Sequence, residues 1–128
     1  MIKEKAYPEI AEIRAPEIPP LERYVIQAPD PEELKVFVHL VNRYYGDYAI
    51  PGIFRYPGKL ADMLAGDEYG AAVAVDGAGR IGGGVLWQRV SAETVEWLGP
   101  YLFNQPAFSG MALDLVDACI GAIARSRA

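Results

Sequence analysis

The chain has 128 residues, of which 52% are hydrophobic and 23% charged, and its formal net charge is −5. This balance is typical of a folded globular domain and excludes intrinsic disorder, which needs low hydrophobicity and high charge. The acidic charge, with no run of Lys and Arg, argues against nucleic acid as the main partner.

The cysteine usage and the hydropathy pattern predict a cytoplasmic protein. Cys119 is the one cysteine, so the chain can form no internal disulfide, as expected in a reducing compartment. No apolar run approaches the ~20 residues that span a membrane. The charged N-terminus lacks the apolar core of a secretory signal. We therefore expect a cytoplasmic protein without a membrane partner.

Residues 1–22 are predicted to form a Pro- and Glu-rich arm ahead of a domain at 23–128. Pro8, Pro16, Pro19 and Pro20 punctuate this arm. Proline fixes φ and removes a hydrogen-bond donor, which disfavours helix. The arm is either an extended tether on the domain or a linker from a preceding domain.

A strand at 23–27 and a helix at 31–45 open the domain. β-Branched and aromatic residues favour the strand. Asp30 is placed to cap the helix, Pro31 to occupy its first position and Glu33 to close a capping box. Gly46 is placed to end it. A second, short helix is predicted at 57–65, after an aromatic loop.

Three strands are then predicted at 70–75, 80–90 and 93–98. Residues 76–79 (Asp-Gly-Ala-Gly) have the composition of a hairpin turn, and Ser91 and Ala92 make the next reversal. Such short connections force antiparallel pairing, because parallel neighbours need long crossovers. Gly99 and Pro100 interrupt the third strand, which can resume through 101–103. Since Pro100 donates no ladder bond, the interruption is an edge, a bulge or a splay point.

A last helix is predicted at 110–124. Four apolar residues at helical spacing are predicted to form its buried stripe: Leu113, Val116, Ile120 and Ile123. Asp114 in the first turn and Arg125 just past the end both suit the helix dipole. Cys119 lies among apolar residues and is expected to act as a small buried hydrophobe.

The order strand, helix, short helix, three-strand meander, helix resembles the N-terminal half of a GCN5-related N-acetyltransferase (GNAT). The hairpin from Ala71 to Gly84 resembles that family's strand, turn and I/V-G-G segment, and the likeness covers about residues 23–124. It implies an α+β (α/β) fold. The family continues with a strand, a helix and two further strands that this sequence lacks. We expect either a fragment of a longer protein or completion by a partner, and the bare sheet edge favours a homodimer.

The resemblance also implies an acyl-CoA site at the start of the last helix. The family's pyrophosphate motif is best matched at 107–112, where Gly110 and Ala112 fit but Ala107 replaces Arg or Gln. Gln105 lies two positions early. Helix N-terminal N–H groups bind anions, and small residues allow close approach; a small residue before a helix can equally serve packing alone. The residues implied to hold acetyl-CoA or another acyl-CoA are Leu98, Gly99, Tyr101, Phe103, Ser109, Gly110, Met111 and Ala112.

Glu96 is the candidate general base, since acyl transfer to an amine needs a group that takes the amine's proton. The alternative is an ordinary solvent-facing glutamate. His39 is the one histidine. No carboxylate or thiol side chain lies at the spacing of metal ligands from it, so we expect no metal site. Aromatic residues around the loop after the first helix can shape an acceptor site, a satellite core or a partner surface: Tyr44, Tyr45, Tyr48, Phe54 and Tyr56.

Two functions follow from the resemblance. The first is an acetyltransferase-like domain that binds acyl-CoA and transfers an acyl group to an amine. The alternative is a non-catalytic module of the same fold, used for ligand sensing or protein association. A different α/β sensor fold with a similar meander is a third interpretation.

Overall fold

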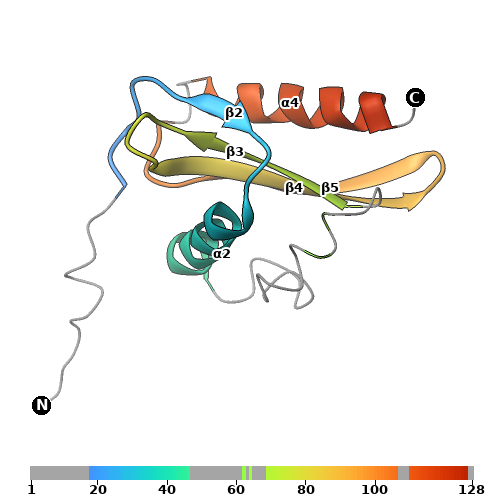
Figure 1. The fold of residues 1–128 in the computed structure, drawn as a ribbon, viewed down its shortest axis with the longest axis horizontal. Coiled ribbons are helices and arrows are strands. Elements are labelled where there is room, and N and C mark those ends of the chain that lie inside the picture. Colours follow the sequence, from blue (N-terminus) through green and yellow to red (C-terminus); the bar gives the residue numbers. More distant parts are fainter. Residues whose placement is uncertain (1–17, 47–61, 63, 65–68, 107–109, 127–128) are drawn as a thin grey trace, which may run out of the picture.

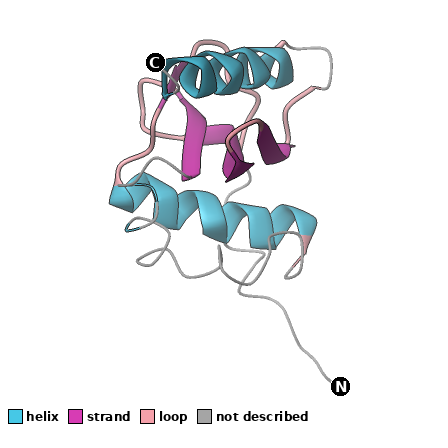
Figure 2. Ribbon diagram, turned by 90° about the vertical axis from the view of Figure 1, so that its right-hand side faces the viewer, coloured by secondary structure: helices cyan, strands magenta, loops and turns pink. Residues whose placement is uncertain are grey.

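The computed structural model describes residues 18–46, 62, 64, 69–106 and 110–126. Four antiparallel strands form one sheet, in the spatial order β2 (Val25–Gln27), β3 (Tyr69–Val75), β4 (Ile81–Ser91) and β5 (Thr94–Leu102). Helix α2 (Pro31–Tyr45) covers one face of this sheet, and helix α4 (Met111–Ser126) covers the other (Figures 1 and 2). The α+β class and the antiparallel meander are therefore as the sequence predicts.

Helix α2 begins and ends where its capping residues predict. The Asp30 carboxylate accepts a hydrogen bond from the Glu33 backbone N–H (2.7 Å), and the Glu33 carboxylate accepts one from the Asp30 N–H (3.0 Å). Gly46, with a φ of 98°, ends the helix, and its N–H donates to the Asn42 carbonyl. The reciprocal bonds satisfy two N–H groups that the first turn would otherwise leave unpaired.

Each face of the sheet has its own hydrophobic core. On the α2 side, Phe37 and Val41 of the helix pack against alternate residues of the sheet, including Val73 and Leu86. On the α4 side, Leu115 and its helix neighbours pack against the intervening residues, such as Val85. This alternation follows from the two-residue period of a strand.

The predicted buried stripe of the last helix is wrong for two of its four residues, whereas Ile123 packs against the α4-side core and Val116 is half-buried. Leu113 is 68% exposed and Ile120 is 52% exposed, whereas Met111, Leu115 and Cys119 are fully buried. The helix has apolar residues around most of its circumference, so apolar periodicity alone does not decide which stripe lies on the sheet.

Glycines in the sheet allow close approach of large side chains. A Cβ added at Gly84 would lie 2.5 Å from the Phe37 ring, and one at Gly82 would lie 3.0 Å from the Met111 side chain. The Gly82–Gly84 run therefore accommodates side chains from both helices. The ring of Trp87 lies over another glycine, Gly70.

Several predicted boundaries shift by one or two residues. The first strand is confined to Val25–Gln27, and the reversal after β4 lies at Ala92 and Glu93 rather than at Ser91 and Ala92. The predicted short helix at 57–65 lies largely outside the described residues, and so do residues 1–17 of the arm. The described end of the arm is held by side chains: the Ile18 N–H donates to the Tyr44 hydroxyl (3.0 Å).

Candidate functional site

A β-bulge opens the outer strand of the sheet at Gly99 and Pro100. Tyr101 pairs with Gly84 and Leu98 pairs with Leu86, so two residues of β5 lie opposite Val85 alone. Gly99 has a φ of 97°, and a Cβ there would lie 2.8 Å from the Tyr101 nitrogen. A left-handed conformation with this crowding requires glycine. Of the three alternatives that the sequence leaves open here, the structure has a bulge on an edge strand.

The end of β5 is bound by a side chain of α2. The Leu102 backbone N–H donates to the Tyr45 hydroxyl (2.8 Å), and that hydroxyl donates to the Leu102 carbonyl (3.0 Å). The Tyr45 ring meets the Tyr101 ring edge-on, with centroids 5.1 Å apart. Tyr45 belongs to the aromatic group that the sequence singles out, but its contact with β5 joins residues 57 positions apart, and no local pattern predicts it.

Helix α4 starts shortly after this edge, and its first residues have contrasting environments. Gly110 has a φ of 92°, and no described atom lies within 4 Å of the place where its Cβ would be. Met111 is fully buried, and Ala112 is half-buried. The open space at Gly110 leaves room for a ligand to approach the backbone, but the Met111 side chain belongs to the core. Ser109 lies outside the described residues.

Two predicted cofactor residues of β5 also contribute their side chains to the core. Phe103 is fully buried, and Tyr101 is 7% exposed. Their rings lie against Phe37, with centroid distances of 5.9 Å for Phe103 and 6.1 Å for Tyr101. Burial raises the pKa of the Tyr101 phenol. The side chains of these two residues are therefore not available to a ligand, and the Phe103 N–H donates to the Gly82 carbonyl of β4.

Polar side chains around the α4 start are used within the fold. The Gln105 amide donates to the carbonyls of Pro19 and Phe103 and accepts from the Leu21 N–H. Gln105 therefore fastens the arm and does not replace the residue that the pyrophosphate motif lacks. The Asp114 carboxylate accepts from the Tyr24 hydroxyl (2.7 Å). Burial, and next the bond to Asp114, raise the pKa of Tyr24 to about 12.

Glu96 lies on β5 before the bulge and faces the α2 side of the sheet. Its neighbour Trp97 pairs with Trp87, which packs on the α4-side core, so the alternation of the strand turns Glu96 and Leu98 to the other face. Leu98 packs against the α2-side core. Glu96 itself is exposed and opposite Gln88. The structure does not bring it into hydrogen-bond contact with a described tyrosine.

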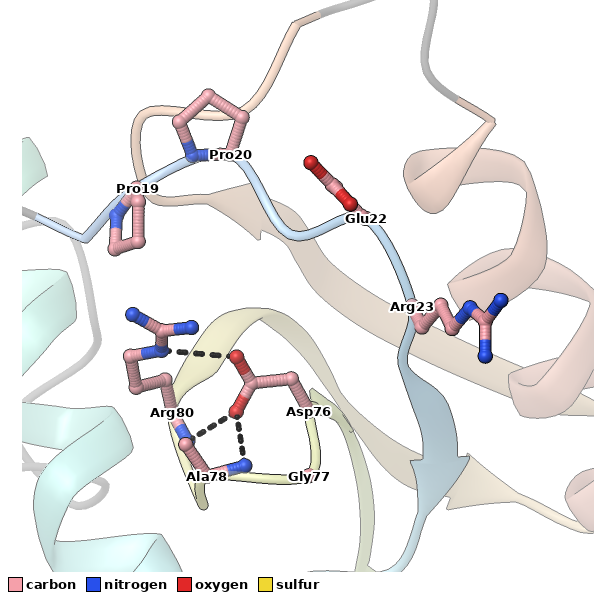
Figure 3. A pocket seen from close by; sticks show the side chains of 8 residues that line it. All are labelled: Pro19, Pro20, Glu22, Arg23, Asp76, Gly77, Ala78 and Arg80. Atoms are coloured by element: carbon pink, nitrogen blue, oxygen red, sulfur yellow. Dashed lines mark hydrogen bonds and ion pairs between the residues drawn. The ribbon is translucent and has the colours of Figure 1, made fainter.

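A hollow of ≈ 380 Å³ at the β3–β4 turn has charged walls but few available groups (Figure 3). Asp76 accepts hydrogen bonds from the backbone N–H groups of Ala78 and Arg80 and from the Arg80 side chain. These bonds lower the pKa of Asp76, with the Arg80 backbone bond as the largest cause. Arg23 and Glu22 point away from this pair (Figure 3). We assign Asp76 a role in the turn.

Two smaller hollows adjoin the ring of Trp87. Their volumes are ≈ 240 Å³ and ≈ 130 Å³, and both are lined by Ala28, Ala71, Trp87 and Ala122. They lie where β2 ends, since its last residue, Gln27, pairs with Val73 and leaves the start of β3 without a described neighbouring strand. The walls of the larger hollow are mostly apolar, whereas the smaller hollow also has Gln27 and Arg125 in its walls.

The described part of the chain shows neither a metal cluster nor a membrane span. No three His, Cys, Asp or Glu side chains among the described residues are grouped as metal ligands. No described helix has the length and apolar character needed to cross a membrane. Cys119 is fully buried, and burial raises the pKa of its thiol to about 11. The burial of Cys119 is as the sequence predicts, and a thiol of this kind is a poor nucleophile.

No family model, no curated protein and no solved structure matches the chain. Any function must therefore be inferred from the site itself.

Asn42 of α2 has a buried polar atom without a partner among the described residues. The Asn42 side-chain oxygen is buried without a hydrogen-bond donor among the described residues, and Asn42 lies one helical turn before Tyr45 on the same flank of α2. No local sequence pattern predicts that the Asn42 side chain is buried in this way.

Proposed function

We propose that this chain is a GNAT-like domain that binds acyl-CoA along the outer edge of β5 and at the start of α4. One arrangement carries the proposal. The edge strand β5 is opened by a bulge at Gly99 and Pro100, and the helix that follows it, α4, begins with open space at Gly110. An edge strand offers backbone amides to an extended ligand. A helix start offers N–H groups to a phosphate.

The site fits the parts of acyl-CoA unequally. Backbone N–H groups at Gly110 and Ala112 are available for a pyrophosphate, and the edge from Leu98 to Leu102 suits a chain of amides. No Lys or Arg occurs between Arg89 and Arg125, so the loop before α4 and the first turns of α4 offer a pyrophosphate only backbone groups and the helix dipole. We therefore expect weaker binding than in a site with a cationic side chain.

Bound acyl-CoA supplies an acyl group that is activated as a thioester. The chain's own contribution is to hold the amine and to accept its proton, and Glu96 is the candidate for that role. Its carboxylate is on the α2 side of β5, on the same face as Leu98. Because the carboxylate is exposed, a bound acceptor would have to shield it.

The second candidate is a non-catalytic module that senses a small ligand. The observation that favours it is the apolar hollow of ≈ 240 Å³ beside Trp87, together with the lack of Lys and Arg in the segment from 90 to 124. Pockets lined mainly by apolar and aromatic groups are typical of small-molecule sites. This module would keep the same fold and would not need a general base.

A thermal-shift experiment with acetyl-CoA tests the first function. At an excess of ~100 times Kd, one-site binding adds about 2.7 kcal/mol to the unfolding free energy, which raises the Tm by roughly 10 °C for a domain of this size. Gly110→Glu should abolish the shift by placing a side chain and a negative charge at the helix start. Gly79→Glu is the matched control, since Gly79 also has positive φ (83°) and open space. No shift in the unmodified chain would refute acyl-CoA binding.

A further inference from the structure

The sheet has an open corner where β3 begins, at the edge opposite to β5. Gln27, the last residue of β2, pairs with Val73 of β3. Residues 69–72 of β3 therefore have no strand beside their outer edge among the described residues. On the next strand, the ring of Trp87 lies over Gly70, which has no side chain of its own to fill the corner.

Two adjoining hollows lie at this corner, and their walls differ in polarity. The described walls of the larger hollow, of ≈ 240 Å³, hold no polar side chain apart from the indole of Trp87. The smaller hollow, of ≈ 130 Å³, also has Arg125 in its walls. Four residues line both hollows: Ala28, Ala71, Trp87 and Ala122. The corner therefore suits an apolar group with a polar group next to it.

Arg125 is the one cationic side chain among the described residues that line the two hollows. No Asp or Glu is among these residues, and Arg125 forms no ion pair within the described part of the chain. Arg125 lies in the last turn of α4, where the helix end carries partial negative charge. An anion can therefore bind beside this helix end only through the guanidinium.

We propose that this corner binds a small organic acid, with its apolar body against Trp87 in the larger hollow and its carboxylate on Arg125. A guanidinium binds a carboxylate through two parallel N–H···O bonds, and an aromatic ring packs well on another ring. A single cation balances one negative charge, which favours a carboxylate over a phosphate dianion. Since an engineered cavity of about 150 Å³ binds benzene, a hollow of ≈ 240 Å³ has room for a body of that size.

The inference rests on the second candidate function, the small-ligand module, and gives that module a ligand class. It is independent of acyl-CoA binding, because the acyl-CoA site is placed at β5 and at the start of α4, whereas Arg125 lies at the other end of α4.

Two probes of the same shape and different charge test the inference. They are 3-phenylpropionate and its uncharged amide, 3-phenylpropionamide, and they are titrated into the ¹⁵N-labelled full chain. The acid should bind roughly tenfold more tightly than the amide, which corresponds to one net hydrogen bond to a charged group. Equal affinities would overturn the carboxylate assignment. Both probes should shift the signals that surround the corner, and shifts elsewhere would overturn the site: Ala28, Ala71, Ala122 and the Trp87 indole.

Arg125→Gln removes the charge that is proposed to hold the carboxylate. In this variant the acid should bind no more tightly than the amide, and the affinity for the amide should stay the same. Lys35→Gln is the matched control, because it removes one positive charge from α2, where Lys35 pairs with Glu32, and it should leave both affinities unchanged. Equal losses in the two variants would indicate an effect of net charge and overturn the role of Arg125.

Ala122→Leu tests the hollows themselves. Ala122 lines both of them, so a leucine there should fill the space and abolish binding of both probes. Ala124→Leu is the control, because Ala124 lies on the exposed side of the same helix, and its affinities should be unchanged. Unchanged binding by Ala122→Leu would overturn the site. The comparison of Arg125→Gln with Lys35→Gln decides the inference even where Ala122→Leu does not fold.

The remaining outcomes separate this inference from both candidate functions. Equal binding of the two probes at the corner overturns the ligand class and leaves the small-ligand module standing. Binding of neither probe at millimolar concentration overturns the inference and leaves acyl-CoA binding to its own thermal-shift test. Displacement of the acid by acetyl-CoA would overturn the assignment of two separate sites.

Discussion

The orientation of α4 predicts that the same substitution has a large effect on stability at one leucine of this helix and almost none at another. Leu115 is fully buried in the α4-side core, whereas Leu113 is 68% exposed. Leu115→Ala removes buried methyl groups and leaves a cavity, which typically costs about 2–5 kcal/mol of unfolding free energy. Leu113→Ala removes atoms that already contact water, so it should change the unfolding free energy by less than about 0.5 kcal/mol. The difference between the two variants should therefore exceed about 1.5 kcal/mol.

Urea unfolding, followed by circular dichroism at one protein concentration, measures this difference. A loss near 3 kcal/mol also corresponds to a Tm decrease of roughly 12 °C for a chain of this length. The slope of the free energy with urea should stay the same, so that the midpoint alone reports stability. Equal losses in the two variants, or a larger loss in Leu113→Ala, would refute the helix orientation and restore the stripe predicted from the sequence.

Two further predictions concern polar groups. Because the pKa of Asp76 is lowered in the folded state, its contribution to stability is complete above the ordinary value of 3.8 and is lost as the pH falls through the folded-state pKa. The unfolding free energy of Asp76→Asn should therefore fall less steeply below pH ~4 than that of the unmodified protein. Equal slopes of the two proteins in acid titrations would contradict this. Asn42→Leu replaces a buried oxygen that lacks a described donor, and it should raise the unfolding free energy by about 1 kcal/mol; a loss of stability in urea would show that the oxygen has a favourable role.

Local signals allow much of the fold to be predicted from the sequence. Asp30, Pro31 and Gly46 define the ends of α2 because capping depends on residues within a few positions of each other. Residues 76–79 define the β3–β4 turn for the same reason. Gly99 and Pro100 predict an interruption of the third strand, and the structure has a bulge there.

The parts that the sequence does not predict depend on contacts between distant residues. Leu113 and Leu115 are equally apolar, and only the approach of α4 to the sheet decides which is buried. Gln105 suits a phosphate loop by its type, although it lies two positions early, but it binds Pro19 and Leu21 of the arm, which are more than 80 positions away. The Tyr45 contact with Leu102 has the same origin.

Backbone amide shifts of the ¹⁵N-labelled chain during titration with acetyl-CoA test the central claim most directly, because they report both binding and its place. The account predicts that the amides of Gly99, Leu102, Gly110 and Ala112 shift together with a single saturation curve. Shifts confined to Ala28, Ala71 and the Trp87 indole would contradict it and favour a small-ligand module. The absence of any shift at saturating acetyl-CoA would contradict acyl-CoA binding by this chain.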